Sequence, residues 1–147
     1  MRLTRAGEYA IRCVLYLAMN RDRRIVGRKE IAEAMDIPAQ FLGKVAQNLG
    51  RAGLIAIHQG ARGGYELVTA PEDLSLLAVV EAIDGEIFLN DCLHRPESCE
   101  RSPLCSVHRV WQRARTELRA TLGGMSLAQL VEEETRQSGI RPAGPSA

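Results

Sequence analysis

Three cysteines and a histidine lie close together in the sequence between Cys92 and His108. They follow the spacing Cys-x6-Cys-x5-Cys-x2-His, through Cys99 and Cys105. The prolines and serines among them indicate a loop rather than a helix or a strand. Thiolates on a flexible loop can wrap a soft metal centre, because sulfur binds such metals well. This stretch is therefore the candidate metal site.

The spacing leaves three interpretations of the site open. An iron–sulfur cluster would use the three cysteines and one further ligand. A zinc ion accepts three cysteines and one histidine, but structural zinc sites usually have cysteine pairs with only roughly two to four residues between them. Free thiols or a redox-active pair of cysteines need no metal. We favour the iron–sulfur cluster.

His108 is the favoured fourth ligand. It follows Cys105 by about one helical turn, so both side chains point to the same side if a helix has begun there. An imidazole together with three thiolates suits a 2Fe–2S centre. The alternative for His108 is a helix histidine that is only hydrogen-bonded near the loop.

The composition is that of an ordinary soluble protein, but its charge is unevenly distributed. The chain has 147 residues, of which 46% are hydrophobic and 25% charged, and no apolar run is long enough to span a membrane. Residues 1–70 carry a net charge of +5 and residues 71–147 a net charge of −4. The basic first half indicates a polyanionic partner. We expect no signal peptide and a reducing, cytoplasmic environment, where cysteines serve metal or redox chemistry more often than disulfides.

The first third of the chain predicts a helix-turn-helix. Apolar residues at helical spacing predict a helix over residues 4–20, with Thr4 as its N-cap and Cys13 in the core. A short second helix over residues 28–36 ends before a proline, Pro38, which we place at the first position of the third helix.

A β-hairpin follows the third helix. Two β-type runs, residues 54–57 and 65–68, flank a glycine-rich turn that carries Arg62. Two helices followed by a hairpin with a basic tip describe a winged helix. A phosphate-cradling nucleotide loop is disfavoured, because no helix follows the glycines directly.

Polar residues of this region predict how it would bind DNA. Those on the exposed face of residues 38–52 would enter a major groove, because Gln, Lys and Arg read base edges or bind phosphate. Arg62 at the hairpin tip would touch the DNA backbone or the minor groove. An ordinary helical hairpin with a solvated polar face is the alternative. The predicted DNA-binding residues are Arg28, Gln40, Lys44, Gln47, Arg51 and Arg62.

The second half predicts three further helices. Ser75 caps the first of them, which turns Leu77, Val80 and Ile83 inward and ends at Gly85. The second is a long helix over residues 104–122. The third begins with a capping box, Ser126-x-x-Gln129, and runs to about residue 134, before a frayed tail over residues 139–147.

The long helix carries a narrow apolar seam that alternates spacings of three and four residues. We interpret this seam as a homodimer interface, because a narrow stripe on an arginine-rich helix buries little within one chain. The alternative is packing within the chain. The seam residues are Leu104, Val107, Trp111, Ala114 and Leu118.

Together these features resemble the winged-helix iron–sulfur regulators of the IscR and NsrR type, the Rrf family. The resemblance covers nearly the whole chain. It is carried by the opening Met1-Arg-Leu-Thr, the run from Asp36 to Leu49, the wing Gly60-Ala-Arg-Gly-Gly-Tyr65, Ala82-Ile-Asp-Gly85 and the cysteine loop ending at Trp111.

The resemblance implies a homodimeric regulator that binds a double-stranded DNA operator. It implies one cluster per subunit at Cys92, Cys99 and Cys105, and neither a membrane nor a small-molecule substrate as partner. It also implies a rival fourth ligand. In NsrR an acidic residue at the place of Glu8, supplied by the partner subunit, completes a 4Fe–4S centre.

Two departures from the family pattern concern DNA recognition. The wing has Gln59 where the family usually has arginine, and Gly43 stands where IscR has an acidic residue in its recognition helix. The family's operator sequence therefore does not carry over to this chain.

We predict a mainly α fold with a small β-hairpin wing. Its parts are a winged helix-turn-helix domain over residues 1–72, a linking helix and cysteine loop over 73–103, and a dimerisation helix, short C-terminal helix and tail over 104–147.

The predicted function is a transcriptional repressor or activator controlled by the cluster. The sequence shows no combined set of nucleophile, base and orienting group that would indicate an enzyme. The alternatives are a metal-free thiol redox regulator and an iron–sulfur electron-carrier or cluster-transfer protein.

Overall fold

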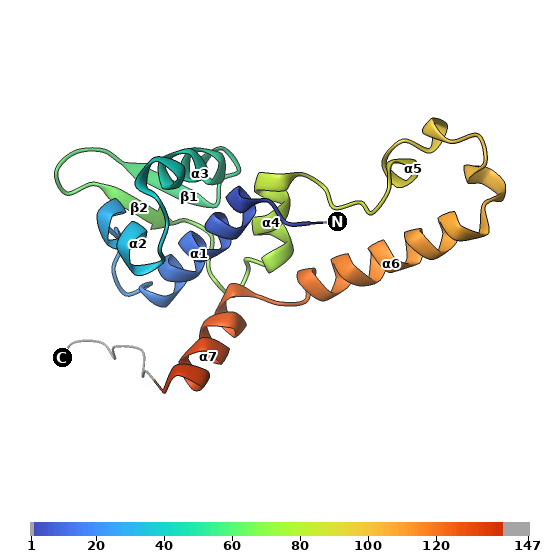
Figure 1. The fold of residues 1–147 in the computed structure, drawn as a ribbon. Helices are drawn as coiled ribbons and strands as arrows, with labels where there is room; N and C mark the ends of the chain where they lie inside the picture. Colours follow the sequence, from blue (N-terminus) through green and yellow to red (C-terminus); the bar gives the residue numbers. More distant parts are fainter. Residues whose placement is uncertain (1, 140–147) are drawn as a thin grey trace.

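The computed structural model describes residues 2–139, and it is mainly helical with one two-stranded sheet (Figure 1), as predicted. In the described part no helix is both long and apolar enough to cross a membrane. The elements are α1 (Arg5–Met19), α2 (Arg28–Ala34), α3 (Ala39–Arg51), β1 (Ile55–His58), β2 (Gly64–Leu67), α4 (Leu76–Asp84), α5 (Asp91–His94), the 3-10 turns η1 (Pro96–Ser98) and η2 (Ser102–Leu104), α6 (Ser106–Gly123) and α7 (Leu127–Ser138).

Helix α1 lies at the centre of the fold. Its apolar face packs against α3, α4, α7 and β2. Ala10, Cys13 and Val14 on this face are completely buried, which confirms Cys13 as a core residue. Thr4 is the N-cap, as predicted, because its side chain accepts a hydrogen bond from the Gly7 amide.

The N-terminus of α1 is tied to the C-terminus of α4. Asp84, the last residue of α4, accepts a hydrogen bond from the Thr4 amide at 3.1 Å and another from the Thr4 hydroxyl. A Cβ atom at Gly7 would lie 2.8 Å from Asp84 Oδ2, so the close approach of the two helix ends needs glycine there.

The helix-turn-helix and the hairpin form as predicted, with shifts of one or two residues. Pro38 is the N-cap of α3 rather than its first residue, because its ψ of 130° is not helical. The two strands are antiparallel, with Ile55 paired with Leu67 and His58 paired with Gly64.

Helices α4 and α7 complete the body. Ser75 caps α4 and a capping box opens α7, both as predicted. Two details differ from the prediction. In α4 the buried residues are Val79 and Val80, and Val79 was not among the residues predicted to face inward. Helix α7 runs four residues further than predicted, to Ser138. The apolar core takes in Leu74, Val79 and Leu127, so it extends beyond the predicted boundary at residue 72. The predicted tail lies outside the described residues except for Gly139, the C-cap of α7.

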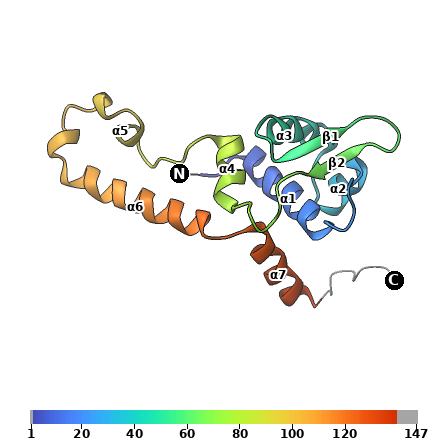
Figure 2. The same ribbon diagram turned by 180° about the vertical axis from the view of Figure 1, so that it is seen from behind.

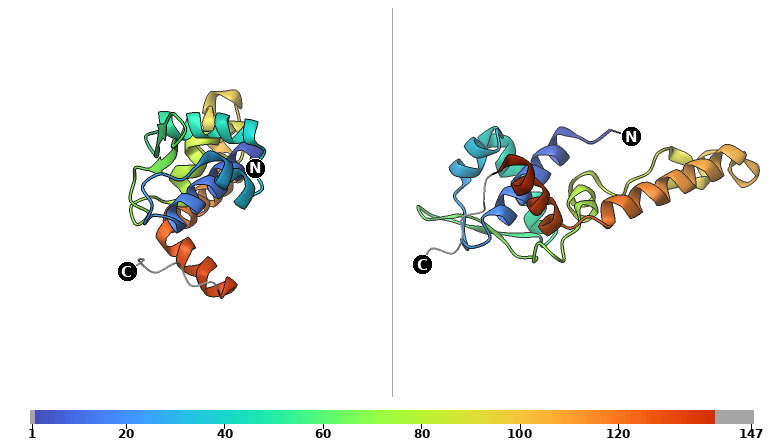
Figure 3. Two further views of the ribbon diagram at one scale, coloured as in Figure 1. Left: turned by 90° about the vertical axis from the view of Figure 1, so that its left-hand side faces the viewer. Right: turned by 90° about the horizontal axis from the view of Figure 1, so that it is seen from below.

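Helix α6 projects away from this body and carries the cysteine loop at its far end (Figures 1 and 2). No residue of α6 is buried in the described chain. Leu104 was wrongly placed in this helix: it ends η2, and Cys105 is the N-cap of α6. The hairpin and the cysteine loop lie at opposite ends of the molecule (Figure 3).

Candidate nucleic-acid interface and metal centre

Helix α3 has one apolar face and one polar face. Leu42, Val45, Ala46 and Leu49 are buried against the body. The polar residues Gln40, Lys44, Gln47 and Arg51 are all exposed. Four donor-bearing side chains therefore line one side of a helix that is fixed by its other side, as reading base edges requires.

The turn before α3 is held by an arginine from α1. Asp36 has a φ of 51°, in the left-handed region that non-glycine residues seldom occupy. Arg12 Nη1 donates to the carbonyl oxygens of Met35 and Asp36, each at 3.3 Å. The Arg12 guanidinium also lies 5.6 Å from the centre of the Tyr9 ring. These contacts fix the angle between α2 and α3.

The predicted DNA-binding cations differ from their basic neighbours in one respect. Within residues 2–139, Arg28, Lys44, Arg51 and Arg62 have no carboxylate oxygen within 4.0 Å. All four are exposed. Exposed cations without an internal counter-ion are available to phosphate oxygens.

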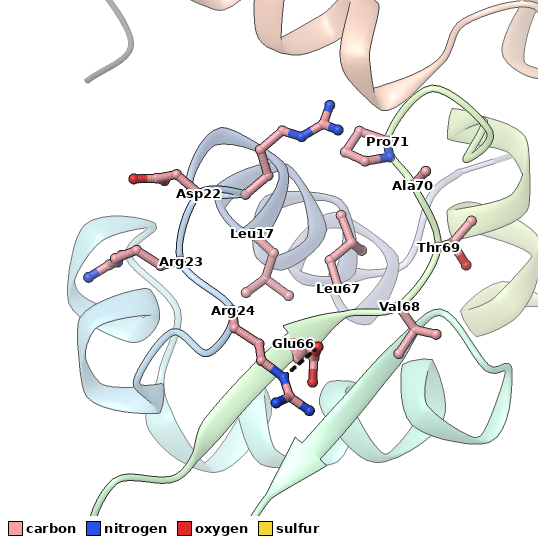
Figure 4. A pocket seen from close by; sticks show the side chains of 11 residues that line it. Leu17, Asp22, Arg23, Arg24, Glu66, Leu67, Val68, Thr69, Ala70 and Pro71 are labelled. Carbon is pink, nitrogen blue, oxygen red and sulfur yellow. Dashed lines mark hydrogen bonds and ion pairs between the residues drawn. The ribbon is translucent and has the colours of Figure 1, made fainter. Parts of the chain in front are cut away.

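The other basic residues near the wing are neutralised. A hollow of about 370 Å³ between the end of α1, β2 and the segment after it is rimmed by Arg23, Arg24 and Glu66 (Figure 4). Arg24 pairs with Glu66 at 3.1 Å, and Arg23 pairs with Glu30. A hydrogen bond from Arg23 lowers the pKa of Glu30, so this carboxylate stays ionised and paired.

The three loop cysteines lie on different short elements. Cys92 is in α5, Cys99 follows η1, and Cys105 caps α6 by accepting a hydrogen bond from the His108 amide at 3.4 Å. Cys99 is exposed, whereas Cys92 and Cys105 are half-buried, and none of them forms a disulfide. The segment is thus a chain of single turns rather than the open loop predicted.

His108 is half-buried and has an unsatisfied ring nitrogen. Its Nδ1 atom is buried and has no hydrogen-bond partner in the described part of the chain, and the same holds for the Ser102 hydroxyl. Both residues line a hollow of about 390 Å³, together with Cys99. A buried polar atom without a partner is unfavourable, which makes His108 a candidate to accept a ligand or a proton donor.

The candidate ligands are near one another in sequence but do not converge. Across residues 2–139, no three side chains of His, Cys, Asp or Glu lie close enough to hold a metal ion. Cys105 and His108 share one helical turn, and Cys99 lines the same hollow as His108, but no three of these donors come together in the described chain. The donor types fit an iron–sulfur centre, and the turns between them would have to close around it.

Glu8, the rival ligand, is on the body rather than on the loop. It lies in the first turn of α1, half-buried, with its carboxylate 3.8 Å from Arg5. The cysteine loop of the same chain is at the far end of α6 (Figure 3). Only a second subunit could therefore bring a cysteine loop to Glu8.

Three of the five residues of the predicted dimer seam are exposed in the described part of the chain. Val107 is 54% exposed and Trp111 is 40% exposed, while Ala114 and Leu118 are half-buried. Leu104, just before the helix, is 92% exposed. Such contiguous apolar exposure is unusual for a monomer's surface.

Two arginines fasten α6 to the end of α4 and to the start of the cysteine loop. Arg119 donates to both carboxylate oxygens of Glu81, at 2.9 and 3.0 Å, and these hydrogen bonds lower the pKa of Glu81. Arg115 Nε donates to the Ile87 carbonyl at 2.6 Å, and Arg115 also pairs with Glu86. The loop and α6 therefore leave the body as a unit.

Comparison with known proteins identifies the family. Residues 3–133 match the Rrf2 family, which is described as iron-dependent transcriptional regulators. The chain belongs to the Rrf2 family. This confirms the resemblance seen in the sequence, and it makes the protein a DNA-binding transcriptional regulator rather than an enzyme.

Several Rrf2 relatives align along most of the chain. It is 30% identical to the regulator IscR of Aliivibrio salmonicida, over 93% of this chain and 82% of that one, and 32% identical to NsrR of Halalkalibacterium halodurans, over 91% and 92%. Its fold matches that of T. potens IscR, with a TM-score of 0.73 at 21% identity over 98% and 94% of the chains. It also matches the oxidised form of Staphylococcus aureus CymR, with a TM-score of 0.70 at 26% identity over 90% and 97%.

Sequence reasoning missed the residues that join the parts of this Rrf2 chain. Arg12, Arg115 and Arg119 lie on the polar faces of their helices and look like solvated cations in the sequence. Their partners are 23 to 38 residues away, too far for any local pattern to reveal.

Burial predicts a difference in reactivity among the cysteines. In the metal-free protein at about pH 8, iodoacetamide should alkylate Cys92, Cys99 and Cys105 and leave Cys13 intact. Burial raises the pKa of Cys13 to about 12 and blocks access to its sulfur. Mass spectrometry should count three additions to the native protein and a fourth only in denaturant. Early modification of Cys13 would contradict the packing of α1.

Proposed function

We propose that this Rrf2 protein is a homodimeric regulator whose affinity for its operator is controlled by an iron–sulfur cluster on the cysteine loop. One observation carries the cluster assignment. Within residues 2–139, Nδ1 of His108 is buried without a hydrogen-bond partner, and the backbone amide of the same residue donates to Cys105 Sγ at the end of a loop with two further thiols. The family description as iron-dependent supports the same assignment.

DNA binding follows from the polar face of α3 and the wing. The exposed side of α3 enters a major groove, and Arg62 at the hairpin tip contacts the backbone or the minor groove. In a dimer, two such units require half-sites about one helical turn, roughly 34 Å, apart. The free cations of this face, Arg28, Lys44, Arg51 and Arg62, supply the electrostatic attraction.

The residues that would hold the cluster are Cys92, Cys99, Cys105 and His108, with Glu8 of a partner subunit as the rival to the histidine. A bound cluster would supply an iron-dependent and redox-sensitive link between the thiolates of the loop. With His108 as ligand the donor set suits 2Fe–2S, and with Glu8 it suits 4Fe–4S.

The chain's own contacts offer a route from the loop to the DNA-binding face. Arg115 holds Ile87 at the start of the loop, and Arg119 holds Glu81 in α4. Asp84 in the same helix caps α1, which packs directly against α3. Closing the loop therefore acts on helices that position the recognition helix.

A thiol-based redox regulator without metal is the second candidate. It is favoured by the exposed thiol of Cys99, which is accessible to oxidants, and by the lack of any three converging ligands within residues 2–139. The two candidates differ in whether the purified protein contains iron and sulfide. Protein purified without oxygen should be coloured and contain iron and acid-labile sulfide if the cluster is present, and colourless if the thiols act alone.

Removing Lys44 or Arg62 should weaken DNA binding at every sequence. Lys44→Ala and Arg62→Ala should each lower affinity and reduce the salt slope of log K by about one per lost phosphate contact. Fluorescence anisotropy across a salt series measures both quantities.

Matched controls come from the neutralised cations. Lys29→Ala and Arg21→Ala remove residues that pair with Glu33 and Glu72, so they should leave the salt slope unchanged. Equal slopes for all four variants would argue against this DNA-binding face.

The seam on α6 should hold the dimer. Trp111→Ala should weaken dimerisation by on the order of 2–4 kcal/mol, because buried aromatic anchors dominate interface energies. Sedimentation equilibrium gives the dimer dissociation constant. With its amide oriented to satisfy both polar atoms, Asn90 accepts a hydrogen bond from Trp111 Nε1 at 3.1 Å, so Asn90→Ala controls for this contact within the chain. A monomeric wild type at micromolar concentration would show that the seam packs internally.

The fourth ligand can be assigned by substitution. After reconstitution with iron and sulfide without oxygen, His108→Ala should lose the cluster or shift its absorption and circular dichroism spectra. Glu8→Ala should keep the wild-type spectrum. His94→Ala is the matched control, because His94 lies in the loop but stacks on Phe88. The reverse pattern would assign Glu8 and make the cluster bridge two subunits.

A further inference from the structure

The side chain of Arg28 reaches from α2 onto the recognition helix. A Cβ atom placed on Gly43 would lie 3.1 Å from Arg28 Nη2, closer than ordinary contacts of this kind. The guanidinium therefore rests against α3 at the place where a side chain of residue 43 would begin. Gly43 follows Gln40 by three residues and precedes Gln47 by four, so these three positions share one ridge of α3.

The base of Arg28 is fixed to the wing. Val26, two residues earlier, exchanges two hydrogen bonds with Tyr65 of β2, each 2.9 Å long. A Cβ atom at Gly64 would lie 2.1 Å from the Val26 carbonyl oxygen, so the wing strand passes this segment too closely for any side chain at position 64. The backbone next to Arg28 is thus held in place by the wing strand.

The charge of Arg28 also acts on a buried tyrosine of the wing. Tyr65 is only 1% exposed. Burial raises the pKa of its hydroxyl, and the charge of the nearby Arg28 opposes that rise. Arg28 has no carboxylate partner among the described residues and remains exposed. A planar cation that rests on α3, is exposed and has no carboxylate partner is arranged for recognition rather than for an internal ion pair.

Glycine in a helix interior needs a reason, because it is less favourable there than alanine by about 1 kcal/mol. Helix α3 has two such glycines on the same flank. Gly50 faces Ile57 at an ordinary distance of 3.6 Å, so an added methyl group fits there. At Gly43 an added methyl group would meet Arg28 Nη2 at 3.1 Å, so the guanidinium would have to shift by a few tenths of an ångström. The missing side chain at position 43 lets the Arg28 side chain lie directly on α3.

We propose that Arg28, seated on Gly43, is a sequence-determining residue of the DNA interface and reads a guanine in each half-site. The proposal rests on the DNA binding proposed above and deepens it. Arginine donates two parallel hydrogen bonds to O6 and N7 of guanine in the major groove, the commonest specific protein–DNA contact. Gly43 acts as a positioning residue that lets the guanidinium lie on α3.

The test begins with selection from a double-stranded DNA pool with a randomised core. It uses the full-length protein, both reconstituted with iron and sulfide and metal-free. Wild type should enrich a G·C pair at a fixed place in each half-site. Replacing that pair should weaken wild-type binding on the order of tenfold to a hundredfold, whereas Arg28→Ala should bind both DNAs equally.

Two glycine variants separate positioning from stability. Gly43→Ala should lower the discrimination between the two DNAs without lowering the melting temperature, since alanine favours the helix. Gly50→Ala should gain the same helix propensity and keep wild-type discrimination.

Three results would contradict the proposal, each in a different way. If Arg28→Ala weakens binding to all DNAs alike and reduces the salt slope by about one, Arg28 contacts only phosphate and the inference is overturned. Full discrimination in Gly43→Ala overturns the role of the glycine. If wild type enriches no DNA in either form, the proposed DNA binding fails, and this inference fails with it.

Discussion

The shared packing of helix α1 is the constraint on which the rest of the structure depends. Its apolar face contacts α3, α4, α7 and β2 at once. The recognition helix and the helix that leads into the cysteine loop therefore rest on one support. Because Asp84 also closes the N-terminus of α1, α4 cannot move without disturbing the first turn of that helix. In a densely packed core such a displacement is passed on rather than absorbed.

The cations differ in whether a glutamate pairs with them. Cations that face the body or the hollow beside β2 are neutralised by glutamates, as with Arg23, Arg24 and Arg119. The cations of α3, Arg28 at the start of α2 and Arg62 at the wing tip have no such partners in the described chain. The wing and the cysteine loop lie at opposite ends of the molecule (Figure 3). Under the proposed function, control of DNA binding by a cluster on the loop would therefore pass through the helices of the body.

The projection of α6 explains why a second subunit matters. A helix without one buried residue gains little from its own chain, and the Arg115 and Arg119 contacts fix its direction without covering its apolar side. In the dimer that we propose, this surface would be buried, and the partner's body would be brought near the cysteine loop. The choice between His108 and Glu8 as fourth ligand is therefore also a question about subunit geometry.

The sequence alone determined the elements, because their signals are local: the stripe that buries Cys13, the caps at Thr4, Ser75 and Ser126, and the glycine-rich wing. Its errors were shifts at boundaries, such as Pro38 and Leu104, where a cap residue resembles the first residue of a helix. Only the tertiary structure decided which polar side chains meet. Arg12 on the α2–α3 turn, Arg119 on Glu81 and Arg28 over Gly43 join positions far apart in sequence. A cation on a helix surface carries no local sign of the partner that folding brings to it.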